Sequence, residues 1–111
     1  MTVKELLERT DKFVIEVGGD FTREISRVYV CDLLSFAMGK APADGAWVTV
    51  MGNVNAVAVA SLTDTAVIVL AENVHIDNIG RVKAEMGNIN VLRTELGAFE
   101  ASLLIHTLIT S

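Results

Sequence analysis

The apolar run AVIVL, at residues 66–70, constrains the fold more than any other feature of this sequence. Consecutive apolar residues of this kind are typical of a strand that is buried on both faces, which needs a layer of structure on each side. The β-rich segment WVTVM precedes it at residues 47–51. Two such strands can pair in parallel only if a crossover of roughly a dozen residues joins them, and the segment from residue 53 to residue 65 can supply it.

That crossover segment, GNVNAVAVASL, can be interpreted in two ways. A Gly-Asn turn would make it a hairpin, whereas Asn53 as an N-cap would make it a helix. The hairpin would remove the helix between the two strands, so we favour the helix although its valines have low helix propensity. The alternation of strand and helix from Trp47 onward then predicts parallel βαβ units with right-handed crossovers.

Capping signals mark two further helices. Thr2 and Glu5 have the spacing of a capping box, which predicts a short helix that turns Val3, Leu6 and Leu7 inward. Asp32 is expected to cap a helix in the segment LLSFAMG, with Gly39 as its left-handed C-terminal residue.

Periodicity predicts the other elements. The helix with the strongest signal is expected over residues 75–87, where apolar residues recur at helical spacing: Ile76, Ile79, Val82 and Met86. Strands are predicted at 13–17, 27–31 and 89–92, and a closing helix at 97–109.

Charge and composition exclude several classes of function. Lys and Arg number 9 against 14 Asp and Glu, giving a net charge of -5, and no segment concentrates the bases, so nucleic acid is not an expected partner. The longest uncharged stretch, residues 45–63, contains glycine and asparagine, so we expect no membrane insertion. A lone cysteine and an N-terminus without an apolar core suggest a reducing cytoplasm.

The apolar content predicts self-association. Hydrophobic residues make up 51% of the chain, and a small domain can bury the excess against a partner subunit. We expect a homodimer or larger homo-oligomer whose interface includes helix surface. The helix over residues 53–62 and the last helix are the candidates, because both are apolar on more sides than one sheet can cover.

Polar residues at the carboxyl ends of the predicted strands are the candidate ligand site: Gly52, Asn53, Asn55 and His75. The commoner roles are an N-cap for Asn53, a solvated side chain for Asn55 and a surface loop position for His75. His75 has no second histidine or cysteine at ligand spacing, so no metal site is predicted.

Cys31 and Asp32 are secondary candidates. Cys31 could be a nucleophile or redox sensor, but a lone cysteine in an apolar strand is more often a small core residue. Asp32 could be an acid or base beside it, although a helix cap is the commoner role. No nucleophile, base and orienting group can be identified together, and we predict that the chain is not an enzyme.

The segment RVYVCDLLSFAMGKAPADGAWVTVMGNVNAVAVASLTDTAVIVLAENVHID resembles the stand-alone DRTGG-domain proteins, and the similarity extends over nearly all of residues 1–111. The motif that names the family is absent, since MGNVNAV stands in its place. The resemblance implies a three-layer α/β/α sandwich with a mostly parallel central sheet, similar to the N-terminal domain of HPr kinase/phosphorylase. It also implies a regulatory or subunit-associating role. The kinase half and any GxxxxGK[ST] loop are missing, so no nucleotide triphosphate or other cofactor is expected.

Three functions stay open at this point. The first is a non-catalytic regulatory or ligand-sensing module that dimerises and binds a small anionic molecule, or a regulatory protein, near the helix N-termini. The second is a small acyl- or phosphoryl-transfer enzyme using Cys31, Asp32 and His75. The third is a scaffold without a ligand. We favour the first.

Overall fold

The computed structural model describes all of residues 1–111 and contains five helices and five strands. The helices are α1 (Val3–Arg9), α2 (Leu34–Lys40), α3 (Val54–Thr63), α4 (Asn78–Met86) and α5 (Ala98–Thr110). The strands are β1 (Val14–Val17), β2 (Arg27–Val30), β3 (Gly45–Thr49), β4 (Val67–Leu70) and β5 (Asn90–Arg93).

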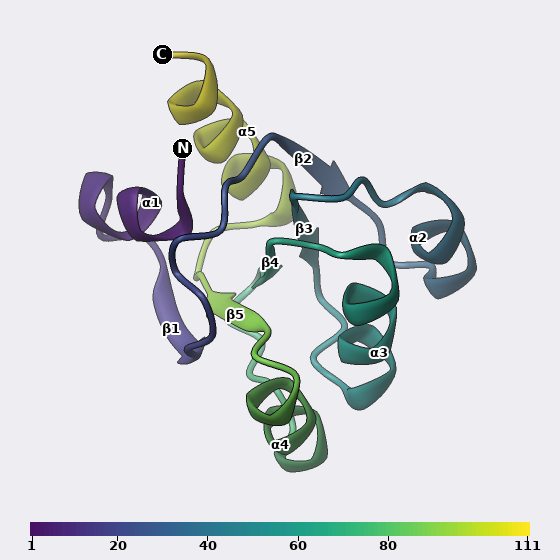
Figure 1. Cartoon of the computed structure of the whole chain (residues 1–111). Coiled ribbons are helices and arrows are strands. Elements are labelled where there is room, and N and C mark those ends of the chain that lie inside the picture. The colour runs from purple at the N-terminus through teal and green to yellow at the C-terminus, as the bar shows by residue number, and fades with distance from the viewer.

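The strands form a single sheet in the order β1-β5-β4-β3-β2 (Figure 1). Strands β2 to β5 run parallel, and only β1 runs antiparallel, along β5. The register between β1 and β5 shifts between Ile15 and Val17. The mostly parallel sheet expected from the sequence is therefore confirmed.

The segment between β3 and β4 is a helix and not a hairpin. Asn53 is the N-cap of α3, and its side-chain oxygen accepts a hydrogen bond from the Ala56 N–H at 3.0 Å. The helix crosses over so that Trp47 in β3 pairs in parallel register with Ile68 in β4. Every residue of β4 is buried, as expected for a strand covered on both faces.

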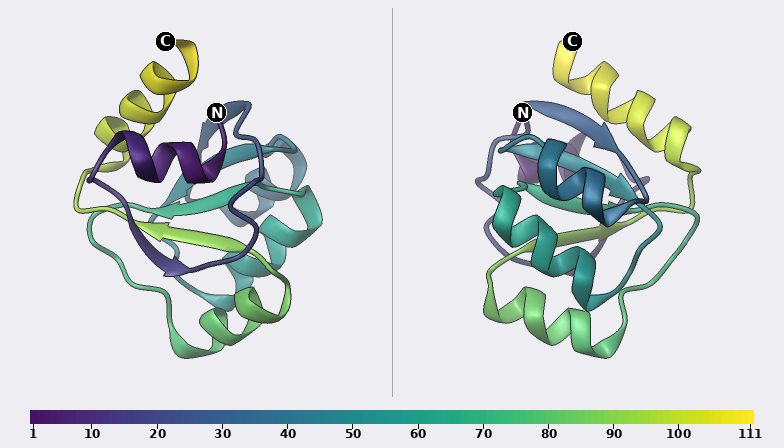
Figure 2. Two further views of the ribbon diagram at one scale, coloured as in Figure 1. Left: turned by 60° about the vertical axis from the view of Figure 1, so that its left-hand side comes forward. Right: turned by 90° about the vertical axis from the view of Figure 1, so that its right-hand side faces the viewer.

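Helices cover both faces of the sheet, which gives the three-layer sandwich (Figure 2). On one face, α1 and α5 pack on the sheet through residues such as Leu6, Ile105 and Val69. On the other face, α2, α3 and α4 lie in a row and enclose Trp47, Val57 and Ile68 among others.

Helix α1 begins with the predicted capping box. The Glu5 N–H donates to the Thr2 hydroxyl oxygen at 3.0 Å, and the Glu5 carboxylate accepts the Thr2 N–H at 3.1 Å. Val3 and Leu6 are fully buried and Leu7 is half-buried, so the predicted inward face is confirmed.

Both predicted caps of α2 are wrong. The N-cap is Leu33, which offers no side-chain hydrogen bond, and the Asp32 carboxylate instead binds β3 and the residue after it. Gly39 lies inside the last turn, no glycine in the chain has a positive φ, and the helix ends at Ala41 with an extended backbone.

Helix α4 forms where predicted, with Asp77 as its N-cap, but its apolar stripe faces outward. Ile76, just before the helix, is buried, whereas Ile79, Val82 and Met86 are exposed by 70%, 55% and 79%. The buried residues of the helix itself are the small ones, Gly80 and Ala84. Their size lets α4 approach α3 closely, whereas Ile79 and Val82 are exposed to solvent and Met86 borders the groove between the two helices.

Candidate functional site

The carboxyl ends of strands β2 to β5 share one edge of the sheet, and the connections that leave this edge go to opposite faces. After β2, β3 and β4 the chain leads to α2, α3 and α4 on one face, whereas after β5 it leads to α5 on the opposite face (Figure 2). Neighbouring strands whose connections leave toward opposite faces create the crevice where open α/β sheets bind ligands. Here that point lies between β4 and β5.

Two loops meet at this division, residues 71–77 after β4 and residues 94–97 after β5. They are joined by hydrogen bonds from the Glu72 N–H to the Leu96 carbonyl (2.9 Å) and from the Asn73 N–H to the Thr94 carbonyl (2.8 Å). Glu72 and Asn73 have φ angles of 58° and 59°, in the left-handed region that non-glycine residues seldom adopt. The tertiary structure thus holds two consecutive strained residues at this edge.

A charged cluster lies beside the loops and is centred on Glu16 of β1. The Glu16 side chain is only 8% exposed, and one of its oxygens accepts the Ile76 N–H at 3.1 Å. His75 Nδ1 lies 3.3 Å from a Glu16 oxygen, and Arg93 Nε and Arg81 Nη2 lie at 3.6 and 3.7 Å. One buried carboxylate is therefore surrounded by two guanidinium groups and an imidazole. We call Glu16, His75, Arg81 and Arg93 the Glu16 cluster.

Arg93 is the member of the cluster with unused hydrogen-bonding capacity. Its side chain is 18% exposed, and its Nη1 donates to the Asn73 side-chain oxygen. Its Nε is buried and makes no hydrogen bond, because the Glu16 oxygen at 3.6 Å is too distant. Arg93 also lines a polar surface hollow of about 270 Å³, together with Asp11, Lys12, Thr94 and Glu95. The hollow and the Glu16 cluster therefore share this guanidinium.

Three of the four residues predicted for a ligand site belong to neighbouring segments. Gly52 packs so closely on the loop after β4 that a Cβ there would lie 2.5 Å from the His75 carbonyl oxygen. The Asp77 N–H donates to the Gly52 carbonyl at 2.9 Å, which fixes the contact. Asn53 follows directly and caps α3. His75 is 63% exposed and points its Nδ1 to Glu16.

Asn55 does not join this group. It is exposed on α3 and lines a groove between α2 and α3 with Leu34 and Met38, whereas His75 precedes α4 on the other side of α3.

Side chains of the protein cap two of the helices that begin at this edge, α3 and α4, whereas α2 and α5 have no side-chain cap. Asn53 caps α3, and the Asp77 carboxylate accepts the Gly80 N–H of α4 at 2.7 Å. At the start of α5, carboxylate oxygens of Glu72 and Glu100 crowd Gly97, 2.9 and 3.1 Å from where its Cβ would stand. Besides these uncapped helix starts, the edge offers the cationic side chains of the Glu16 cluster as donors to an anion.

Cys31 and Asp32 lie at the end of β2, and no hydrogen bond or ion pair joins either to His75. Cys31 is half-buried and belongs to neither core cluster, so the core position expected for it is wrong. Its Sγ accepts the Leu33 N–H at 3.4 Å. Burial, and then a hydrogen bond with the Cys31 thiol, raise the pKa of the neighbouring Tyr29.

Sequence reasoning missed Glu16, Arg81 and Arg93. A signal was present, because Glu16 lies within the otherwise apolar strand VIEV and Arg93 follows the apolar pair Val91 and Leu92 at the end of β5. Such residues are seldom buried unless they are paired, which would have suggested that the two strands meet.

No group of three or more His, Cys, Asp and Glu side chains is placed to hold a metal ion. None of the five helices combines the length and the apolar character that crossing a bilayer requires.

Comparison with known proteins identifies a shared fold. No protein-family model matches the sequence, and no curated protein matches it. A solved structure is similar, the crystal structure of the CBS and DRTGG domains of the regulatory region of Clostridium perfringens pyrophosphatase, complexed with its activator diadenosine tetraphosphate. The two chains share a fold. The TM-score is 0.68 at 13% sequence identity, over 94% of the present chain and 45% of the other, so this protein spans under half of that chain.

Proposed function

We propose that residues 1–111 form a DRTGG-like regulatory domain that binds a small anionic ligand at the carboxyl edge of its sheet and associates with a second copy. The observation that carries the ligand site is Arg93. It is the last residue of β5, its buried Nε makes no hydrogen bond, and it lines an open polar hollow.

The Glu16 cluster supplies the donors for an anion. It places two arginines and a histidine around one carboxylate, and the hollow beside it is lined by Lys12 and Arg93 as well as by the carboxylates of Asp11 and Glu95. A guanidinium presents paired donors that match a carboxylate or a phosphate group. In the proposed site Arg93 and Lys12 bind the anion and His75 borders it, while Gly52 and Asn53 hold the His75 loop in place.

The fold supports a regulatory role by analogy. The similar structure is a regulatory region complexed with an activator. A shared fold does not transfer a ligand, so this analogy supports the class of function only.

The enzyme alternative lacks the geometry that it needs. Covalent catalysis requires a nucleophile within hydrogen-bonding reach of a base, and the structure does not bring Cys31 or Asp32 to His75. The Asp32 carboxylate is also engaged with the Thr49 hydroxyl and the Val50 N–H.

Thermal unfolding with added anions tests the ligand proposal. Inorganic phosphate, acetate and diadenosine tetraphosphate would be titrated separately against the wild-type protein. A ligand that binds the folded state adds about 1.4 kcal/mol of stability for each tenfold rise in concentration above its Kd, so at least one midpoint should climb with concentration. Matched potassium chloride controls for ionic strength.

Two variants locate the site. Lys12→Met should reduce the anion-dependent shift, because it removes a charge from the hollow, whereas Lys40→Met on α2 should leave the shift intact. Arg93→Lys keeps the charge but loses the paired donors, so it should weaken binding too. If no anion shifts the midpoint beyond the salt control, the ligand proposal fails and a scaffold without a ligand becomes the better reading.

A further inference from the structure

The surface hollow beside Arg93 brings together two segments that are far apart in the chain. Val14, the first residue of β1, pairs with Arg93, the last residue of β5, and the two strands run antiparallel. The segment that enters β1 and the segment that leaves β5 therefore lie side by side at one edge of the sheet. Asp11 and Lys12 line the hollow from the first segment, and Glu95 lines it from the second.

The hollow contains charges of both signs that have no partner within the chain. Asp11, Lys12 and Glu95 are exposed, and none of them forms a salt bridge. In the Arg93 guanidinium, Nη1 donates to Asn73 and Nε is buried, whereas Nη2 makes no hydrogen bond and is not buried. Nη2 is therefore the guanidinium donor that remains for a ligand.

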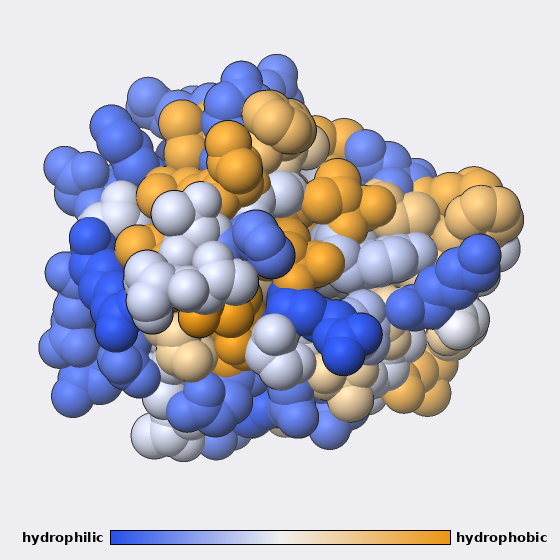
Figure 3. Space-filling model, turned by 90° about the horizontal axis from the view of Figure 1, so that it is seen from above, coloured by the Kyte–Doolittle hydropathy of each residue, from blue (hydrophilic) through white to orange (hydrophobic).

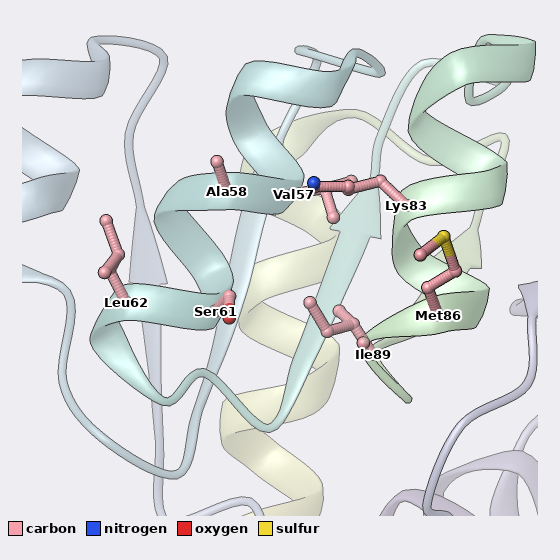
Figure 4. Close-up of a pocket in the computed structure, with 8 residues that line it drawn as sticks. Val57, Ala58, Ser61, Leu62, Lys83, Met86 and Ile89 are labelled. Atoms are coloured by element: carbon pink, nitrogen blue, oxygen red, sulfur yellow. The ribbon is translucent and has the colours of Figure 1, made fainter.

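Charged side chains alone do not mark a ligand site, because they are common on the surface. On the face drawn in Figure 3, strongly hydrophilic residues lie among apolar ones. The groove between α3 and α4 in Figure 4 has a single charged lining residue, Lys83. A smaller hollow contains both Arg23 and Asp64, but these two form a salt bridge with each other at 3.3 Å. The hollow beside Arg93 differs because its exposed charges of both signs are left unpaired.

We infer that the ligand of this hollow is a zwitterionic α-amino acid with a short aliphatic side chain. Its carboxylate binds Arg93 and Lys12, since a guanidinium presents donors that match a carboxylate. Its ammonium group binds Asp11 and Glu95, two carboxylates that repel a ligand with negative charge only. This inference rests on the anion site of the proposed function and specifies the chemical class of its ligand.

The size and the apolar part of the lining agree with this class. The hollow has a volume of about 270 Å³, below the roughly 300–1,000 Å³ that is typical of sites for drug-sized ligands. It therefore suits a smaller molecule, such as a single amino acid. Val14 and Leu96 also line the hollow and offer hydrocarbon surface to a short aliphatic side chain.

Three probes that share an isopropyl group and differ in charge test the inference. L-Valine carries both charges, isovalerate lacks the ammonium group, and isobutylamine lacks the carboxylate. Thermal unfolding of the wild-type protein at increasing concentrations of each probe gives its Kd, because a ligand that binds the folded state raises the midpoint. L-Valine should bind about tenfold more tightly than either of the other probes, since only L-valine makes both charged contacts.

Replacing the two carboxylates tests the ammonium contact. The double variant Asp11→Asn with Glu95→Gln should bind isovalerate at least as well as the wild type does, but it should lose the preference for L-valine. Glu85→Gln on α4 changes an exposed glutamate that forms no salt bridge and does not line the hollow, so this variant should keep the preference. Because all three replaced side chains are exposed, both variants should keep the wild-type circular dichroism spectrum.

Equal affinities for L-valine and isovalerate, or a preference for L-valine that the double variant retains, would overturn the inference. If isovalerate, acetate or phosphate shifts the midpoint and L-valine has no advantage, the anion site of the proposed function stands and the amino-acid ligand is wrong. If no probe shifts the midpoint, both proposals fail.

Discussion

The Asp32 side chain binds residues that are far from it in sequence. One of its carboxylate oxygens accepts the Thr49 hydroxyl at 2.7 Å and the Val50 N–H at 2.9 Å. Thr49 is fully buried, so its hydroxyl depends on this acceptor. The contact joins the end of β2 to the end of β3 at the edge where the candidate site lies.

Replacing Asp32 with alanine should therefore destabilise the protein. Loss of the acceptor leaves a buried hydroxyl without its partner, which costs about 1–3 kcal/mol. Asp32→Asn keeps an acceptor oxygen and should cost less. The free energies of unfolding in urea at pH 7 measure both, and an alanine variant as stable as the wild type would show that the contact is dispensable.

The sequence suggested a different role for Asp32 because an aspartate before a helix looks like an N-cap. An aspartate that caps a helix and one that binds a distant strand look alike in the local sequence. The true partner of Asp32 is Thr49, which lies 17 residues away. Arg93 was missed for a similar reason, since its importance comes from Glu16 on another strand and from Asn73 in another loop.

At the scale of elements, the contact between α3 and α4 depends on a glycine. A Cβ at Gly80 would lie 2.9 Å from the Asp77 carboxylate and 3.2 Å from the Asn53 carbonyl carbon. Ordinarily Gly→Ala inside a helix stabilises a protein by about 0.8–1 kcal/mol. Here the added methyl group would push α4 away from the start of α3.

Two glycine substitutions make a matched test of that packing. Gly80→Ala should destabilise the protein by about 1–3 kcal/mol through overpacking. Gly39→Ala in α2 should instead stabilise it, because nothing lies within 4 Å of the new Cβ. Urea unfolding of both variants measures the difference, and a stabilising Gly80→Ala would mean that α4 can move without penalty.

The capping box of α1 makes part of the stability depend on pH. Hydrogen bonds from the Thr2 N–H and hydroxyl lower the pKa of Glu5 below its ordinary value of 4.5. A lowered carboxylate pKa contributes stability above the unfolded-state value, and this contribution is lost as pH falls through the folded-state value.

The wild-type protein should therefore lose more stability than Glu5→Gln when the pH falls from 6 to about 3. Urea titrations at both pH values provide the comparison. The variant also serves as the control for all other carboxylates, because they titrate in both proteins. Equal losses would show that the capping box does not depend on the Glu5 charge.

The sequence predicted the existence of every helix and strand because each has a periodic pattern or a cap. It did not predict what covers each face. The spacing of Ile79, Val82 and Met86 indicates an amphipathic helix, but it does not distinguish the core from a partner. The small residues Gly80 and Ala84 decide the orientation, and their effect depends on how closely α3 approaches.

At the scale of the whole molecule, the parallel part of the sheet was predictable from crossover length. The antiparallel placement of β1 beside β5 was not, because it joins segments at opposite ends of the chain. The division between β4 and β5 was not predictable either, since it requires α5 to lie with α1 on the face opposite α4. The position of the candidate site thus follows from topology and not from a local motif.

The two ends of the chain lie near each other on one side of the sandwich (Figure 1). Arg9 of α1 donates to the Leu108 carbonyl of α5 at 3.3 Å, and both helices pack on the same face of the sheet. Such a unit can be inserted into a longer polypeptide with little distortion of the host, because entry and exit are adjacent. The connecting segments would leave from the α1–α5 face, on the side of the sheet opposite α3 and α4.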